Sequence, residues 1–392
     1  MKHQTLLVAL IAPAAVACTD LGANPSSSPR PHPTNTAPLP DSGTRPPDGG
    51  MSMKDAQTIV DRWAPPPDTF APPPVTDANS EPPPDPGCGL NTGFAGDEEC
   101  ILPPPPDLGF QVHVGPSNYE NPEADYVLQP GVEKTTPFRA VAGNDADSYF
   151  YYRQYRMRPT AHHVILSTPN GTGVDTGRRI GTANTSQDFP AGGVIAPEDE
   201  GVGMSIAAHS PITVDFHSIN TTSKPQLREV WVNFWYRDAS KVTQPAISWF
   251  ETGSVTFSVP PRASQRLGPY TCSIQGEGRL LWLYGHRHAN NVRFNVARVR
   301  GLQRDVIYDA FKWEEPLLLE YNSKVTNRAP DPDPAKKVEG GWSGILDLRT
   351  GDKIEWFCDV VNNNDTALRF TNQTYLGEMC IVDAEAVGSD CR

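Results

Sequence analysis

The chain has 392 residues and a formal net charge of −13, from 33 Lys and Arg against 46 Asp and Glu. A chain this acidic is a poor candidate for binding nucleic acid. Of its 41 Pro, 22 lie between residues 19 and 106, a composition that cannot build a packed core. The 286 residues that follow (392 − 106) are enough for two ordinary domains.

The N-terminus has the pattern of a bacterial export signal, with Lys2, an apolar run from Leu6 to Ala17, and then Cys18. The run is too short to span a bilayer. Cleavage after Ala17 by an ordinary signal peptidase and acylation of Cys18 both fit the small residues that precede the cysteine. Seven Cys leave Cys18 as the odd one, and the other six could pair in an oxidising compartment. We therefore predict a lipoprotein signal peptide over residues 1–18 and a lipid anchor in the bacterial cell envelope, facing the periplasm or the exterior.

Residues 19–106 are predicted to form a Pro-rich disordered linker that tethers the rest of the chain. A short helix is expected near residues 52–63, where Ser52 and Asp55 can form a capping box and apolar residues recur at helical spacing. A single helix of this length is marginal alone, so we interpret it as a docking helix or a relic.

From residue 107 onward the apolar pattern alternates with a period of two. Strands are predicted over 150–157, 212–219, 230–236, 254–259, 291–299 and 352–361, separated by Gly, Pro and Asn turns. The pattern indicates an all-β fold of two tandem antiparallel β-sandwiches, jelly-roll-like, over residues 107–259 and 260–392. The boundary is placed at Pro260 and Pro261, which disfavour continuing a strand.

The sequence contains no G-x-S-x-G, no H-E-x-x-H and no Gly-rich phosphate loop. The missing motifs argue against a serine hydrolase, a zincin and a nucleotide-dependent enzyme. His286 and His288 are two residues apart and would project from one face of a strand, where they could chelate one ion. Two solvated surface histidines are the alternative for such a pair taken by itself.

His162 and His163 are adjacent, so on a regular strand they would point to opposite faces; they could share an ion only at a strand end or a bulge. His217, in an alternating strand, is a third candidate ligand, with a half-buried histidine bonded to a neighbour as the alternative. His209, in an expected turn, is a rival third ligand. Met379 precedes Cys380, and a bridge from Cys380 to Cys358 would hold Met379 in place.

The order HH, strand His, H-x-H and E-M-C over residues 107–392 resembles the copper type II, ascorbate-dependent monooxygenases, which include peptidylglycine α-hydroxylating and dopamine β-monooxygenase. The resemblance implies two coppers per chain. One, for electron transfer, would be held by His162, His163 and His217. The other, oxygen-activating and catalytic, would be held by His286, His288 and Met379, and a thioether ligand favours Cu(I). It also implies the disulfides Cys358–Cys380 and Cys272–Cys391.

The chain also departs from the family pattern. Where amidating members hold a peptide carboxylate with Arg, Asn and Tyr, this chain has Tyr284, Ile381 and Asp383, which argues against peptide amidation. These three residues are the candidate substrate pocket, with Asp383 as a handle for an amine or hydroxyl. Cys88 and Cys100 are expected to form an additional bridge before the first sandwich.

We therefore expect an oxidoreductase that hydroxylates a C–H bond of a small molecule with O2 and ascorbate or a similar reductant. The alternatives are an envelope lipoprotein that binds copper without catalysis and a structural sandwich, such as an adhesin, in which the histidines are incidental. The ordered match of six ligand types argues against the structural alternative, and two differently ligated sites favour the enzyme over simple storage.

Overall fold

The computed structural model describes residues 87–169, 178–313, 317–371 and 373–392. The signal peptide with Cys18, residues 19–86 of the linker and the expected helix near 52–63 lie outside these residues. The last part of the predicted linker, residues 87–106, is ordered, because a disulfide closes it and Ile101 packs against Trp231. Nearly all of the regular structure described is β, and the only helices within these ranges are single 3-10 turns: η1 Asp97–Glu99, η2 Ala191–Gly193, η3 Pro197–Asp199, η4 Ala239–Lys241 and η5 Pro334–Lys336. None of the helices found in the described part of the chain has the length and apolarity needed to cross a membrane.

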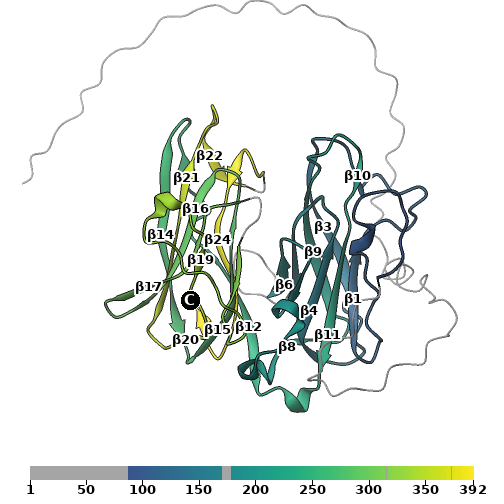
Figure 1. The fold of residues 1–392 in the computed structure, drawn as a ribbon, viewed down its shortest axis with the longest axis horizontal. Coiled ribbons are helices and arrows are strands. Elements are labelled where there is room, and N and C mark those ends of the chain that lie inside the picture. The colour runs from purple at the N-terminus through teal and green to yellow at the C-terminus, as the bar shows by residue number, and fades with distance from the viewer. Residues whose placement is uncertain (1–86, 170–177, 314–316, 372) are drawn as a thin grey trace, which may run out of the picture. The chain divides into compact units, whose positions relative to one another are not determined.

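The predicted all-β fold of two β-sandwiches is confirmed (Figure 1). In the first sandwich a four-stranded sheet has the order β3-β9-β5-β6. Its opposing strands are β1-β11-β4-β8, with β7 added on β4. Their bounds are β1 Gly109–Val114, β3 Glu133–Val141, β4 Ser148–Met157, β5 Ala161–Thr168, β6 Arg178–Ala183, β7 Gln187–Phe189, β8 Val202–Ile206, β9 Pro211–Ile219 and β11 Val230–Arg237.

In the second sandwich, a six-stranded sheet of order β19-β17-β16-β21-β14-β25 packs against β12-β24-β15-β18, with β20 also paired to β15. The bounds are β12 Gln244–Thr252, β14 Ser264–Gln275, β15 Gly278–Arg287, β16 Asn291–Arg300, β17 Gln303–Ala310, β18 Leu318–Glu320, β19 Gly340–Gly341, β20 Leu346–Leu348, β21 Lys353–Val361, β24 Cys380–Val387 and β25 Asp390–Cys391. Two small sheets complete the fold. One pairs β2 Val127–Leu128 with β10 Gln226–Leu227, and the other has the order β13 Ser258–Val259, β22 Leu368–Phe370, β23 Gly377–Glu378.

Strand β12 joins the two groups of strands. Its first residues, Gln244 and Pro245, pair in parallel with β8, and Ala246 to Thr252 pair antiparallel with β24. Most of β12 therefore belongs to the sheet of the second sandwich, although the sequence placed it before the boundary at residues 259 and 260. The sequence analysis predicted no strand here, because β12 begins with Gln-Pro and its charged and polar side chains give no clear apolar alternation.

Two buried hydrophobic cores lie on opposite faces of β15. Leu280 and Leu283 belong to the core of the second sandwich, whereas Trp282 and Tyr284 pack in the core of the first. A strand alternates its side chains between its two faces, so His286 continues the row that begins with Trp282 and Tyr284. The register of β15 shifts between Leu280 and Trp282, and from Trp282 onward the alternation aims the even-numbered residues at the first sandwich.

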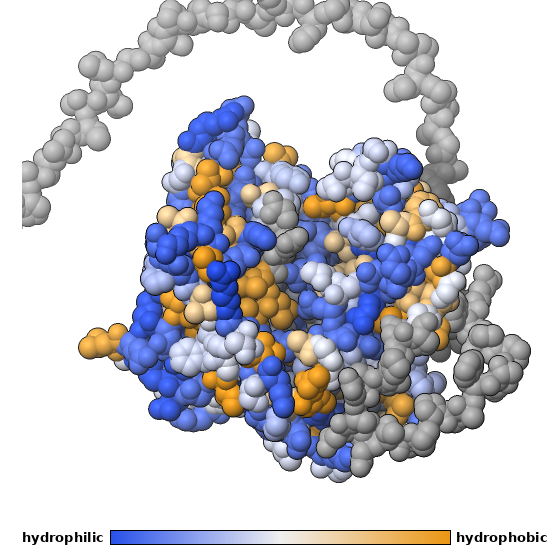
Figure 2. All heavy atoms as spheres, viewed as in Figure 1, coloured by the Kyte–Doolittle hydropathy of each residue, from blue (hydrophilic) through white to orange (hydrophobic). Residues whose placement is uncertain are grey.

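All three expected disulfides are confirmed: Cys88–Cys100, Cys272–Cys391 and Cys358–Cys380. Cys272–Cys391 ties the C-terminal strand β25 to β14, and Cys358–Cys380 links β21 to the start of β24. Across the face seen in Figure 2, hydrophilic residues predominate and hydrophobic residues gather in small groups between them.

Candidate metal centres

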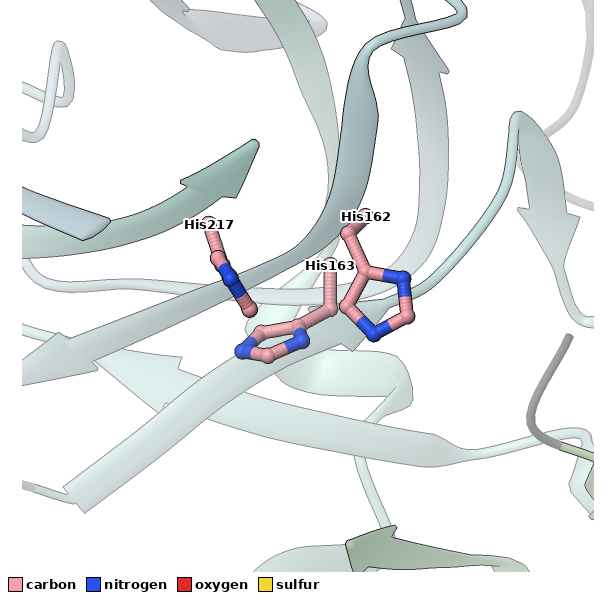
Figure 3. Close-up of side chains that lie close together, drawn as sticks. All are labelled: His162, His163 and His217. Carbon is pink, nitrogen blue, oxygen red and sulfur yellow. The ribbon is translucent and has the colours of Figure 1, made fainter. Parts of the chain in front are cut away.

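His162, His163 and His217 form the first cluster, with one ring nitrogen from each within 4.8 Å of the others (Figure 3). Two nitrogens bonded to the same ion at about 2.0 Å lie at most about 4 Å apart. The nitrogens of this cluster are therefore close to the spacing that a shared ion requires. His163 lies directly across from His217 in the pairing of β5 with β9, and the register shifts between Ala161 and His163. This irregularity is the expected bulge, and it turns His162 toward the same place as its neighbour.

Two histidines of the first cluster, His162 and His163, are held in the neutral form. Removal from water and the neighbouring His217 lower the pKa of His162 to about 4, and the same causes hold the pKa of His163 well below its usual range. Neutral imidazole is the form that binds a metal, so these two histidines need not lose protons at pH 7 to accept one.

A carboxylate orients His217 from outside the cluster. Glu133 Oε1 on β3 lies 2.8 Å from His217 Nε2, and Thr374 Oγ1 lies 3.3 Å from the same nitrogen. Burial alone would raise the pKa of Glu133, but its hydrogen bonds to His217 and Thr374 lower it to about 2. If Nε2 donates to Glu133, Nδ1 is left with a free lone pair; carboxylates commonly orient metal-binding histidines in this way.

The second cluster consists of His286, His288 and Met379. His286 Nε2 lies 3.2 Å from Met379 Sδ, and the rings of His286 and His288 have their centroids 5.7 Å apart. All three side chains are buried, with Met379 only 7% exposed. Nδ1 of both histidines is buried and has no hydrogen-bond partner within the described part of the chain, which fits nitrogens that could bind a metal ion.

Glu378 stabilises the backbone of the second cluster. Its Oε1 accepts hydrogen bonds from the backbone N–H groups of His288, at 2.7 Å, and of Met379, at 2.9 Å. The side chain is fully buried, and burial raises its pKa to about 8 despite these bonds. Burial and the neighbouring His288 hold the pKa of His286 well below its usual range, and burial with His217 and His162 lowers that of His288 to about 3.

The two clusters touch one another. The rings of His163 and His286 lie 4.9 Å apart, centroid to centroid, at an interplanar angle of 75°. All six side chains that the sequence selected therefore converge in one buried region. A soft thioether with two imidazoles on one side and three imidazoles on the other is a donor set that suits copper better than zinc.

His209, the rival third ligand, lies in a turn after β8, and its side chain is 61% exposed and 3.7 Å from Asp145. It is not part of the first cluster.

The three candidate pocket residues face the first sandwich, and all are buried. Tyr284 packs near His286, with ring centroids 6.3 Å apart, and Ile381 pairs with His286 across β15 and β24. Asp383 Oδ2 accepts a hydrogen bond of 2.7 Å from Thr182. Burial raises the pKa of Asp383 to about 6, against the opposing effects of Arg179 and Thr182.

Several contacting residues were missed by the sequence analysis. Glu133 and Thr374 support the first cluster, and Trp313 packs against His162 at 5.2 Å between ring centroids. None of them lies in a motif, and all three meet the histidines only through the fold, so no sequence signal could have identified them.

Comparisons with known proteins leave the family open. No protein-family model and no curated protein matches the chain. Among solved structures it is similar to the STIV MCP, with 10% identity over 72% of this chain and 96% of that one and a TM-score of 0.23. It is also similar to the major capsid protein P2 from bacteriophage PM2, with 8% identity over 72% and 99% of the two chains and a TM-score of 0.26. Similarity at this level carries no argument about function.

Proposed function

We propose that the protein is a copper-dependent monooxygenase that hydroxylates a C–H bond of a small molecule with O2 and an ascorbate-like reductant. The observation that carries the proposal is the convergence of six side chains, scattered from His162 to Met379, into two touching clusters of the predicted composition. Copper held by these side chains would supply one-electron redox chemistry and the activation of dioxygen.

The protein's own groups would prepare the two sites. Glu133 orients the His217 ring, and Glu378 fixes the backbone at His288 and Met379. Four of the five candidate histidines have a pKa below the usual range, so they need not lose protons at pH 7 to bind an ion. Asp383, beside the second cluster in sequence and buried, offers a carboxyl group to a substrate amine or hydroxyl.

The alternative is an envelope lipoprotein that binds copper without catalysis. The near-complete burial of His286, His288 and Met379 favours this alternative, because an enzyme must admit both O2 and substrate. In both cases we propose that Cys18 carries the lipid anchor; a Cys18→Ala variant that still incorporates labelled fatty acid would contradict this part.

The decisive experiment measures copper content and oxygen consumption together. Purified protein reconstituted with copper should hold two ions per chain, and His163→Ala and Met379→Ala should each lose copper bound at one cluster. His209→Ala, an exposed histidine outside both clusters, is the matched control and should retain both ions. Ascorbate-driven oxygen uptake linked to a hydroxylated product supports the enzyme. Two ions without such turnover across a broad substrate panel would favour the binding protein, and no copper binding would refute both.

A further inference from the structure

A second site is built around Glu320, away from the six candidate ligands. A cavity of about 460 Å³ is lined by residues of both sandwiches: Asn184, Thr185, Gln187, Asp188, Ala191, Leu317, Leu318 and Glu320. Its volume is within the range of natural small-molecule pockets. Glu320 on β18 pairs with Trp282, four residues before His286 on β15, so it lies roughly 13 Å along the strand from that ligand.

The charges in this cavity are unbalanced. Among the described residues that line it, two are carboxylates and none is Lys or Arg. Asp188 is compensated by Arg156, at 2.8 Å. Glu320, which is only 6% exposed, forms no ion pair with any described Lys or Arg.

The hydrogen bonds of Glu320 are few and neutral. The backbone N–H of Ala191 donates to Oε1 at 2.8 Å, and Asn322 donates to Oε2 at 3.4 Å, a long contact. Arg153 is close enough to act on Glu320 electrostatically, but its guanidinium is already paired with Glu385 at 2.9 Å. A buried carboxylate without a cationic partner is costly, and a cation in the cavity would remove that cost.

We propose that this cavity binds a small organic cation, with its ammonium group at Glu320 and its apolar part against Leu317, Leu318 and Ala191. The polar groups of Asn184, Thr185 and Gln187 would contact any hydroxyl of the ligand. The site does not depend on copper, so it can be tested on the metal-free protein and its failure would leave the proposed monooxygenase chemistry untouched.

The test uses two quaternary ammonium probes of different size, choline and benzyltrimethylammonium, because their charge does not change with pH. Isothermal titration calorimetry should show saturable binding of at least one probe. The neutral isostere of choline, 3,3-dimethyl-1-butanol, should bind at least tenfold more weakly than choline if choline is the probe that binds. Equal binding of the charged and neutral molecules would overturn the proposal, as would the failure of both ammonium probes.

Variants locate the binding. Glu320→Gln keeps the size of the side chain and should weaken the ammonium probe at least tenfold. Thr185→Trp fills the cavity from its exposed rim without changing the charge, and should abolish binding even if Glu320→Gln folds poorly. Glu251→Gln is the matched control, because this carboxyl is also partly buried but does not line the cavity. The assignment would be refuted if Glu320→Gln and Thr185→Trp both bound the ammonium probe as tightly as the wild type. It would also be refuted if Glu251→Gln lost as much affinity as the cavity variants.

Discussion

Burial of the Glu320 carboxyl leads to a quantitative prediction about stability. Burial, against the smaller opposing effect of the Ala191 N–H, raises the pKa of Glu320 from 4.5 to about 7. The folded protein therefore binds this proton more tightly than the unfolded chain does. Its stability should fall as the pH rises from 4.5 through 7, because the folded state must give up a proton that the unfolded state has already lost.

Glu320→Gln removes this titration while it keeps an oxygen for the Ala191 N–H. A difference of about 2.5 pKa units corresponds to about 3 kcal/mol in favour of the variant once both states of the wild type are ionised. At pH 5 most of this difference is absent, and the same linkage gives about 1 kcal/mol. The variant should thus gain stability over the wild type as the pH rises.

Urea unfolding of the metal-free protein, followed by Trp fluorescence at pH 5 and pH 8.5, measures this change. Differences between variant and wild type at each pH cancel the titration of distant groups. Glu120→Gln, at an exposed position, should change stability by no more than about 0.5 kcal/mol at either pH. If Glu320→Gln differed from the wild type by the same unfolding free energy at both pH values, the cause would be packing and not titration. A variant less stable than the wild type at pH 8.5 would refute the reasoning.

Three further changes test the supports of the candidate centres. Glu133→Gln should weaken copper binding at the first cluster about 10- to 100-fold in competition with a Cu(I) chelator, since it removes the charge that orients a ligand; unchanged affinity would contradict this role. Arg153→Met should cost about 3–5 kcal/mol in urea unfolding, because it leaves Glu385 buried and unpaired, and adding Glu385→Gln should restore part of the loss. Replacing Cys358 and Cys380 together by Ser should cost about 3 kcal/mol, and a Tm equal to that of the wild type would show that the bridge does not restrain the unfolded chain.

The sequence predicted the strands whose side chains alternate. The ranges expected at 150–157, 212–219, 230–236, 291–299 and 352–361 correspond to β4, β9, β11, β16 and β21, and in each case one end agrees and the other differs by one or two residues. Strand 254–259 was too long, since only Ser258 and Val259 pair as β13. Strands β5, β15 and β24 were not among the predicted ranges, because they are buried on both faces and have no clear alternation.

The ligand candidates could be selected from the sequence because their spacing is local: two adjacent histidines, two histidines separated by one residue, and a methionine next to a cysteine. What spacing could not predict is how the clusters meet. His163 and His286 come from different sandwiches, and their contact depends on the face that β15 turns toward the first core.

The contact between His163 and His286 makes the two candidate centres depend on the interface between the sandwiches. The clusters are attached to separate sandwiches, yet buried bonds hold those sandwiches together beside them: Arg153 with Glu385 and Thr182 with Asp383. Each bond joins a strand of the first sandwich to β24, the strand that begins directly after Met379. Whatever shifts β24 must therefore move the thioether and the separation between the two clusters together, so the chemistry of the pair depends on this interface as much as on the six ligands.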